Sequence, residues 1–400
     1  MKENRWLKLA GGAVIFMALG LIYAWSIFRK PISTAFPDWS YSQISLTFTI
    51  SIMSFCLSGL LSGKVFQKTG PAPILLVSAL LLAAGFWGAA FMDPQKPDFS
   101  LILLYIAYGG FCGAGVGLAY NALLSSLLEW FPEQGGIASG ILLMGFGIGG
   151  MLFGSAATFL IRTMGLGKVF GVLGTVMPLL VLAGIRLVAK RPVTQSGTYS
   201  LTKQGKTTSE MLRESFFWKM MLWLVILGSV GLLVVNSSAA IVSAYGGAEV
   251  LGLIVSVFNG FGRVLLGLFY DRFNGKKAML LNSGLFLASG AAFWLGDQLS
   301  SIALITAGLA LAGCGYGGDP TIASALVRET YGEKYYSVNF GIVNLTMIPS
   351  SLIGPLISSK MIEYSGGKYQ STFLMVLFLA VSAGVVWVMM FRRNTTQKGL

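Results

Sequence analysis

The sequence predicts an all-α membrane protein with twelve transmembrane helices arranged as two six-helix repeats. Three observations carry this prediction: an apolar composition, twelve apolar segments long enough to span a bilayer, and motifs of the first half that recur in the second. Of the 400 residues, 55% are hydrophobic and only 11% are charged. Because soluble domains carry about 25% charged residues, the composition predicts a chain whose main partner is the lipid bilayer.

The twelve apolar segments have the length of about 20 residues that a membrane-spanning helix needs. They cover residues 7–28, 43–63, 72–91, 101–128, 135–161, 168–189, 216–243, 249–270, 278–296, 300–327, 337–362 and 370–391. The longest polar interruption divides them into six and six. We therefore expect an N-terminal bundle over residues 1–189, a cytoplasmic linker over 190–215 and a C-terminal bundle over 216–400.

The two halves share sequence motifs at corresponding places. Gly113-Ala114-Gly115-Val116-Gly117 in the fourth segment matches Gly313-Cys314-Gly315-Tyr316-Gly317 in the tenth. The run that begins at Gly63 after the second segment likewise matches the run that begins at Gly267 after the eighth. Paired six-helix repeats are typical of transporters that rock around a site midway through the membrane.

The positive charge of the chain indicates its orientation. The net charge is +13, and most of the 28 Lys and Arg residues fall on one side of the predicted spans; Arg29 and Lys30 are among the few on the other. Cytoplasmic loops are enriched in these residues, so we expect both termini in the cytoplasm and the chain in the cytoplasmic membrane. This distribution explains the charge better than a nucleic-acid partner, and none is expected.

Metal and cofactor chemistry find little support in the sequence. The chain has no histidine, which excludes histidine metal sites and histidine proton relays. Its three cysteines show no paired spacing and read as small packing residues. We expect no metal, no cofactor and no catalytic residue.

Arg263 is the residue that points most directly to function. It lies inside the apolar segment 249–270, where a permanent cation costs about 2.5–3.5 kcal/mol on the insertion scale. Arginine cannot lose its proton to lower this cost. We therefore expect Arg263 to face protein or water and to bind an anion; the alternative is a structural ion pair.

A cytoplasmic loop of the second half resembles the signature loop of the major facilitator superfamily. The matching run is Gly267-x-x-x-Asp271-Arg272-x-x-Gly275-Lys276-Lys277, with Asn274 where that loop usually has glycine. The first half has the corresponding Gly63 and Gly70, but Gln67 stands at the aspartate position. The resemblance implies the major facilitator fold and a conformational role for Gly63, Gly70, Gly267, Asp271 and Arg272.

Two further motifs resemble the oxalate/formate antiporter family and its bacterial monocarboxylate transporter relatives. One is Tyr23-Ala24-Trp25-Ser26-Ile27-Phe28-x-x-Pro31; the other is Trp130-Phe131-Pro132-Glu133-x-x-Gly136-x-Ala138-Ser139-Gly140, followed by Gly145-Phe146-Gly147-x-Gly149. The resemblance covers nearly the whole chain. It implies a substrate-binding arginine at Arg263, an asparagine four residues earlier at Asn259, and aromatic residues at Tyr120 and Tyr316.

The chain departs from its oxalate-carrying relatives at one informative position. Their second cation is a lysine in the eleventh span, which aligns with Met347. One guanidinium matches one carboxylate, so a monocarboxylate of the lactate, pyruvate or formate type is favoured over oxalate. The apolar part of the substrate would pack on Tyr120, Tyr316, Met347 or Phe258. Asn344 would hydrogen-bond the substrate or a neighbouring helix; helix packing is the alternative role for each of these residues.

Asp319 is the second unusual residue, an acid within the tenth segment. Counting from the cytoplasmic helix ends at 1.5 Å per residue places it level with Arg263 to within a few ångströms. One hypothesis is that the two pair in the empty carrier, and that a substrate carboxylate displaces Asp319, which then takes a proton. The alternative is a fixed, ionised Asp319 that caps helix amides near Pro320.

Secondary transport by alternating access is therefore the predicted function, with a small organic anion and a proton as partners and a monomer as the working unit. An oxalate/formate-type anion exchanger is the alternative within transport. A membrane enzyme is disfavoured because no nucleophile, metal cluster or cofactor motif is evident. A non-transporting sensor would be expected to carry an added soluble domain, for which the longest loop is too short.

Overall fold

The computed structural model describes residues 4–128, 130–131, 135–188, 205–332 and 335–392. In these ranges the chain is helical and contains twelve helical segments long and apolar enough to cross a membrane. The prediction of an all-α membrane protein with twelve spans is confirmed, and most of the predicted boundaries lie within a few residues of those observed.

The first six spans run from Arg5 to Val188. They consist of α1 (Arg5–Leu19), η1 (Gly20–Ala24), α2 (Trp25–Ala35), α3 (Tyr41–Thr69), α4 (Pro71–Ala90), α5 (Pro97–Leu104), η2 (Tyr105–Cys112), α6 (Gly113–Leu128), α7 (Gly135–Met164) and α8 (Leu166–Val188).

The last six spans run from Ser215 to Phe391. They consist of α10 (Ser215–Ala244), η3 (Glu249–Leu253), α11 (Ile254–Phe273), α12 (Gly275–Gln298), α13 (Ile302–Tyr331), α14 (Tyr336–Asn344), α15 (Met347–Ser351), η4 (Leu352–Ile357), α16 (Ser358–Tyr364) and α17 (Gln370–Phe391).

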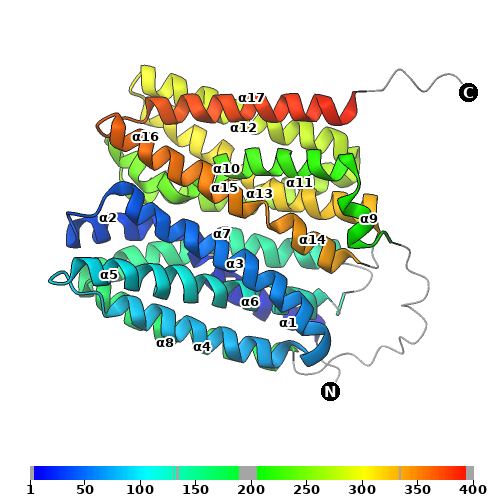
Figure 1. Ribbon diagram of the computed structural model, residues 1–400, viewed down its shortest axis with the longest axis horizontal. Helices are drawn as coiled ribbons and strands as arrows, with labels where there is room; N and C mark the ends of the chain where they lie inside the picture. The colour runs from blue at the N-terminus through cyan, green and yellow to red at the C-terminus, as the bar shows by residue number, and fades with distance from the viewer. Residues whose placement is uncertain (1–3, 129, 132–134, 189–204, 333–334, 393–400) are drawn as a thin grey trace, which may run out of the picture.

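The helices form two bundles that lie side by side (Figure 1). The first bundle, in blue to cyan-green, contains α1 to α8, and the second, in green to red, contains α10 to α17. The described chain begins and ends at the same end of the molecule, which we call the termini side. The opposite end, which carries the loops around α2, α5 and α16, is called the far side.

The linker between the bundles is only partly described. Residues 189–204 of the predicted linker lie outside the described residues. The part that follows contains a short helix, α9 (Thr208–Leu212), which the sequence analysis did not predict. Its start is explained by a capping box, in which Thr207 and Glu210 satisfy each other's backbone amides.

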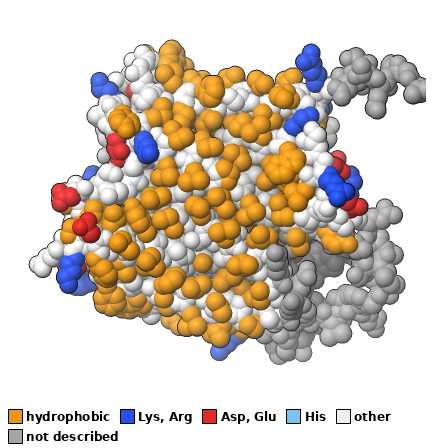
Figure 2. All heavy atoms as spheres, viewed as in Figure 1, with side chains coloured by type: hydrophobic (Ala, Val, Ile, Leu, Met, Phe, Trp, Pro, Cys, Tyr) orange, Lys and Arg blue, Asp and Glu red, His pale blue; other side chains and the backbone are white. Residues whose placement is uncertain are grey.

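The outer surface matches a bilayer environment. Figure 2 shows hydrophobic side chains spread over the middle of the molecule, with Lys, Arg, Asp and Glu gathered toward its two ends. Large apolar side chains such as Leu80, Leu179 and Phe378 are more than half exposed. In water such a surface would be unfavourable, whereas lipid tails are as apolar as the side chains themselves. The chain is a multi-pass membrane protein.

Several spans change helical type near the middle of the membrane. The first span passes from α-helix into a tight 3₁₀ stretch at Gly20–Ala24, and the eleventh breaks at Leu345 and Thr346 between α14 and α15. Broken helices at this depth free backbone polar groups, and they are tolerated only where they face protein or a water-filled cavity. The two breaks bring the side chains described below to one place.

The bundles are joined by hydrogen bonds on the far side. Between described residues, these bonds begin near mid-membrane with Cys56, whose thiol donates to the Asn344 carbonyl at 3.4 Å. Farther out, the Tyr23 and Tyr316 hydroxyls are 3.2 Å apart, and the Tyr41 and Tyr369 hydroxyls are 3.0 Å apart. We call this set of contacts, together with Ser45–Ser359, Thr49–Ser351, Ser42–Glu363 and Lys30–Glu249, the far-side seal.

Candidate functional site

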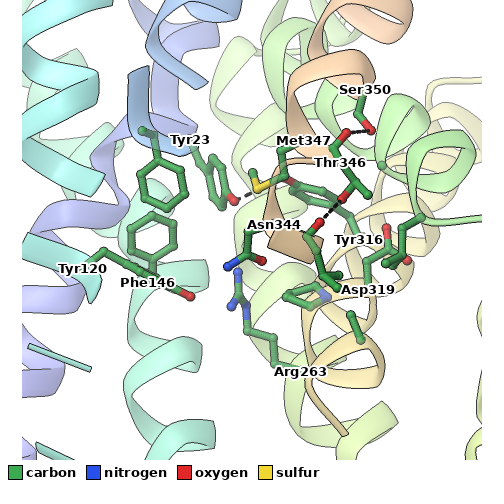
Figure 3. Close-up of a pocket in the computed structure, with 16 residues that line it drawn as sticks. Tyr23, Tyr120, Phe146, Arg263, Tyr316, Asp319, Asn344, Thr346, Met347 and Ser350 are labelled. Atoms are coloured by element: carbon green, nitrogen blue, oxygen red, sulfur yellow. Dashed lines mark hydrogen bonds between the residues drawn. The ribbon is translucent and has the colours of Figure 1, made fainter. Parts of the chain in front are cut away.

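A pocket lies between the two bundles, on the termini side of the Tyr23–Tyr316 contact. Its wall is formed by η1, α3, α6 and α7 of the first bundle and by α10, α11, α13, α14 and α15 of the second. The space between these side chains, including the part open to solvent, is about 610 Å³. Figure 3 shows its side chains converging from both bundles.

Arg263 projects from α11 into this pocket (Figure 3). The residue is 4% exposed, and its Nε donates to the Asn259 Oδ1 at 3.3 Å. Its Nη1 has no hydrogen-bond partner. The expectation that Asn259 and Arg263 share a helix face is confirmed by this contact. Asn259 does not itself line the pocket and acts as a support for the guanidinium.

Two glycines allow α11 to be held so closely. A Cβ on Gly147 of α7 would lie 2.6 Å from the Asn259 Oδ1, and one on Gly317 of α13 would lie 2.0 Å from the Asn259 carbonyl oxygen. Real Cβ atoms do not approach this closely, so any larger residue would push the helices apart. Close backbone approach at glycine is a common way for membrane helices to pack, and here it fixes the residue that orients Arg263.

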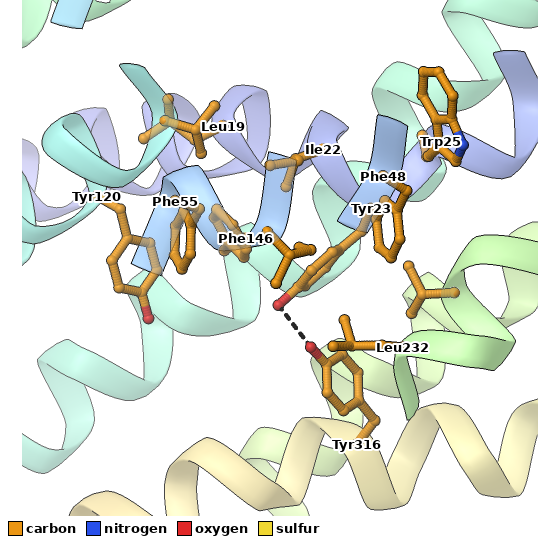
Figure 4. Close-up of a cluster of buried hydrophobic side chains, with 14 of the residues drawn as sticks. Leu19, Ile22, Tyr23, Trp25, Phe48, Phe55, Tyr120, Phe146, Leu232 and Tyr316 are labelled. Carbon is orange, nitrogen blue, oxygen red and sulfur yellow. Dashed lines mark hydrogen bonds between the residues drawn. The ribbon is translucent and has the colours of Figure 1, made fainter. Parts of the chain in front are cut away.

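Aromatic side chains of the first bundle, shown in Figure 4, form one wall of the pocket. The Tyr120 ring packs against Phe146 and Phe55 with centroids 5.1 Å and 5.3 Å apart. Phe146 also packs edge-on against Tyr23 at 5.1 Å and lies 6.0 Å from the Arg263 Cζ. Such a wall offers an apolar surface and ring faces that attract a cation weakly.

Tyr316 closes the pocket toward the far side. Its ring lies 5.8 Å from the Tyr23 ring, and the two hydroxyls form the innermost tyrosine pair of the far-side seal. Gly231 makes room for it, because a Cβ there would lie 2.1 Å from the Tyr316 ring. Tyr23 was not predicted as a site residue, although the motif that begins with it was recognised.

Asp319 also lines the pocket and is 5% exposed. Its Oδ1 accepts a hydrogen bond from the Asn282 Nδ2 of α12 at 2.7 Å, and its Oδ2 has no partner. The expected Arg263–Asp319 ion pair is absent from this structure: within the described residues, no ion pair includes either group. The carboxylate instead takes its hydrogen bond from Asn282 on the neighbouring helix.

The break in the eleventh span supplies the last polar wall. Asn344 ends α14 and Met347 begins α15, and both line the pocket. In Figure 3 Asn344 lies beside the Arg263 guanidinium, and Met347 lies toward Tyr23 and Tyr316. Thr346 and Ser350 donate to carbonyls of their own helix, at Val343 and Thr346. Among the described residues, the pocket wall thus contains one arginine, one aspartate and no lysine.

Phe258 is the predicted binding residue that the structure sets apart. It is 37% exposed, does not line the pocket and packs against Phe261. The reason is helical geometry: adjacent residues differ by about 100° around a helix axis, so Phe258 cannot share the face of Asn259 and Arg263. Its expected contact with substrate has no support in this conformation.

The predicted conformational residues lie on the termini side. Gly70 has φ +74° and is the single residue between α3 and α4, where its lack of a Cβ permits the turn. The corresponding turn between α11 and α12 is Asn274, with φ +107°, and its side chain accepts from the Lys277 amide at 3.1 Å. Asp271 and Arg272 occupy the last turn of α11.

Two residues inside helices complete this set. Gly63 lies within α3, and a Cβ there would meet nothing within 4 Å. Gly267 lies within α11, 3.1 Å from the Thr321 side chain by the same measure. The structure places these residues at matching positions in the two bundles and does not test their role in the conformational change.

Two six-helix bundles around a mid-membrane pocket with one cation define the class of secondary transporters. The family model of the Major Facilitator Superfamily matches residues 9–347 and 238–400, so the chain belongs to that superfamily.

Two relatives and one solved structure agree with this assignment. The chain is 27% identical over 358 residues to the oxalate:formate antiporter of Oxalobacter formigenes, a match that covers 88% of this chain and 83% of that protein. It is 20% identical over 420 residues to human monocarboxylate transporter 2, covering 97% and 85%. A bacterial homologue of the human lysosomal transporter Spinster, solved in an inward-facing, occupied conformation, superposes with a TM-score of 0.72 at 17% identity over 98% of both chains.

Sequence reasoning missed several residues of the site, among them Tyr23, Phe146 and Asn282. Tyr23 and Phe146 belong to motifs that carried the family resemblance. The sequence therefore marked both residues, but it did not show that their side chains point into the pocket. Asn282 carried no such signal. An asparagine in an apolar helix has many possible partners, and only the fold brings α12 against Asp319.

Proposed function

We propose that this transporter carries a small monocarboxylate, of the lactate, pyruvate or formate type, together with a proton. The observation that carries the proposal is the single arginine of the pocket, which is buried, supported by Asn259 and free of an acidic partner among the described residues. A planar guanidinium binds one carboxylate in a bidentate manner. The complex would be electrically neutral and therefore tolerable within the membrane.

Met347 supports the choice of a monocarboxylate over a dicarboxylate. The resemblance to oxalate carriers implies a lysine at this position, and here a thioether lines the pocket instead. A second carboxylate would remain unpaired in a water-poor site, which is costly. The aromatic wall of Tyr120, Phe146 and Tyr316 suits a methyl or methylene group on the same anion.

Asp319 is the proposed proton carrier. It is the acid in the pocket wall, and its Oδ2 has no partner. An ionised carboxylate would oppose a substrate anion that enters the same pocket, whereas a protonated one would not. Binding of the anion therefore favours uptake of one proton, and the pair crosses together. The ion pair with Arg263 that was first expected is not needed for this coupling.

Alternating access would proceed by opening the far-side seal and closing the termini side. With both termini in the cytoplasm, as the Lys and Arg distribution favours, the far-side seal would close the outer side. We propose a monomer in the cytoplasmic membrane, because each chain contains both bundles and the whole pocket.

The test is uptake by the purified protein in liposomes, with radiolabelled lactate, pyruvate, formate and oxalate supplied separately. Uptake of at least one monocarboxylate that rises with an inward proton gradient supports the proposal. Asp319→Asn is expected to abolish the dependence on the gradient while it keeps exchange of anion for anion. Asp98→Asn, at an exposed acid outside the pocket, serves as the matched control. Full proton-driven uptake by the Asp319→Asn protein would disprove the coupling.

The second candidate function is an oxalate/formate-type anion exchanger. The relationship to the Oxalobacter formigenes protein favours it. Counterflow separates the two: an exchanger requires anion on both sides, whereas a symporter loads empty liposomes when a proton gradient is applied.

A further inference from the structure

Arg29 is a second buried cation, and it lies next to the far-side seal, against Tyr41, instead of in the pocket. It belongs to α2 and is 4% exposed. Its Nη1 donates across the bundle interface to the Asn236 carbonyl at 3.2 Å and to the Ser237 Oγ at 3.0 Å. Its guanidinium carbon lies 3.6 Å from the centroid of the Tyr41 ring. The first bundle thus carries the charge, and the second contributes neutral acceptors to it.

No acid of the described chain neutralises Arg29. Glu249 pairs with Lys30, and Glu363 accepts from the backbone amide of Ser42. The Nε and Nη2 of Arg29 have no hydrogen-bond partner. A buried cation without a counter-charge is strongly unfavourable, so a second state in which those donors are used would explain its presence.

The surroundings of Arg29 are polar on both sides of the interface. Ser26 and Ser45 of the first bundle meet Ser238 and Asn236 of the second, and all four are buried. The Asn236 Oδ1 has no partner either. A seal that only excluded water would be apolar. Neutral hydroxyls and amides instead provide a lining that becomes hydrated when the seal opens. Because they carry no negative charge, they do not compete with a substrate anion for Arg29.

Arg29 lies on the line between the pocket and the far side. Tyr23, at the boundary of the pocket, precedes it by six residues on the same span, or about 9 Å of helix rise. The Tyr23–Tyr316 hydroxyl pair closes the pocket at that boundary. An anion that leaves Arg263 toward the far side would pass this pair and then meet Arg29.

We propose that Arg29 is an outer binding station for the transported carboxylate, used when the far-side seal is open. As the bundles separate, Asn236 and Ser237 leave with the second bundle, and the freed donors of Arg29 take the substrate anion. On closure the anion moves past the tyrosine pair to Arg263, and Arg29 returns to its neutral acceptors. This inference rests on the proposed transport of an organic anion and adds a second site to it.

Reactivity of a cysteine placed in the seal tests the station without relying on transport. Ser45→Cys is made in a protein whose Cys56, Cys112 and Cys314 are replaced by alanine. Its rates with an anionic and a cationic methanethiosulfonate are compared. The quantity of interest is the ratio of the anionic to the cationic reaction rate. This ratio is expected to be at least about tenfold higher with Arg29 present than in Arg29→Gln. Lactate should slow the reaction saturably, and methylammonium should not.

Arg29→Lys is the matched control, because it keeps the charge and loses the planar guanidinium. It should retain the preference for the anionic reagent. If Arg29 only holds the two bundles together, Arg29→Gln and Arg29→Lys would each change the rates of both reagents in parallel. The ratio of the anionic to the cationic rate would then stay constant. A constant ratio, or no reaction with either reagent in any of the proteins, would overturn the proposal.

A second variant separates this inference from the proposed function. Arg263→Gln should abolish transport and leave the reagent preference of the Ser45→Cys thiol intact. If the preference persists but no monocarboxylate is transported by the unmodified protein, the outer anion station stands and the proposed substrate is wrong. If monocarboxylates are transported but the reagent preference does not depend on Arg29, the proposed substrate is supported and the outer binding station is refuted.

Discussion

At the scale of single residues, function is concentrated in two buried groups whose environments differ. Arg263 is held by one hydrogen bond from its own helix, whereas Asp319 is held by Asn282 from another helix. Each keeps one polar atom without a partner. Both residues line a common pocket, so an anion and a proton can be accommodated together without a permanent ion pair between the two side chains.

Replacing the arginine tests the anchor directly. Arg263→Gln is expected to lower uptake at least about 30-fold, since losing one partner of a buried charged hydrogen bond costs about 2 kcal/mol or more. Arg263→Lys should retain part of the activity, because it keeps the charge but not the bidentate geometry. The measurement is initial uptake by proteoliposomes. Arg162→Gln, at an exposed helix end, is the control and should behave like the unmodified protein.

Met347 tests the origin of selectivity. Met347→Lys introduces a second cation beside Arg263, and it should raise the ratio of oxalate to lactate uptake at least about tenfold, because the second carboxylate gains a partner worth about 1.4 kcal/mol or more. Met347→Gln changes polarity without adding charge and should not raise it. A ratio that rises equally in both variants would show that charge is not the determinant.

At the scale of helices, the site depends on how closely α11 can approach α7 and α13. The glycines that allow this are spread over three spans, and they could be recognised from the sequence as packing residues but not assigned to particular neighbours. The breaks at Gly20–Ala24 and at Leu345–Thr346 were not predicted, since an apolar sequence looks the same whether its helix is continuous or interrupted. They nevertheless direct Tyr23, Asn344 and Met347 into the pocket.

Gly147 is the position where this packing can be measured. Gly147→Ala should destabilise the protein by about 1–3 kcal/mol, as overpacking commonly does, and should weaken substrate binding because it displaces Asn259. Gly140→Ala lies on the same helix, where a Cβ would meet nothing within 4 Å, and should be neutral. Thermal unfolding in detergent with and without lactate compares the two. Equal melting temperatures would contradict the packing argument.

At the scale of the whole molecule, composition and periodicity were sufficient to predict the fold but not the conformation in which the two bundles meet. Twelve spans and their approximate boundaries were predicted because hydrophobic length is a strong signal in membranes, and the superfamily was predicted from the resemblance of a cytoplasmic loop to its signature motif. Arg29 was assigned to the outer loops because it follows an apolar run closely, and the structure instead buries it between the bundles. Contacts between bundles involve residues hundreds of positions apart, which one sequence cannot pair.

A disulfide bond across the far-side seal should inhibit transport reversibly. Ser45→Cys with Ser359→Cys replaces two hydroxyls that are 2.6 Å apart in different bundles. Oxidation should stop transport, and a reductant should restore it, because alternating access requires these residues to separate. Ser358→Cys with Thr372→Cys joins positions 3.3 Å apart within the second bundle, and its oxidation should leave transport unchanged. Full activity of the oxidised Ser45→Cys, Ser359→Cys protein would contradict a moving seal.

The central claim is that one guanidinium in the pocket anchors one carboxylate, which a proton accompanies. Its most direct measurement is uptake of radiolabelled lactate, pyruvate, formate and oxalate by the same proteoliposomes, with and without an inward proton gradient. The account predicts that at least one monocarboxylate is taken up, that the gradient stimulates its uptake, and that oxalate is poorly transported. Efficient oxalate transport with no transport of any monocarboxylate would contradict it.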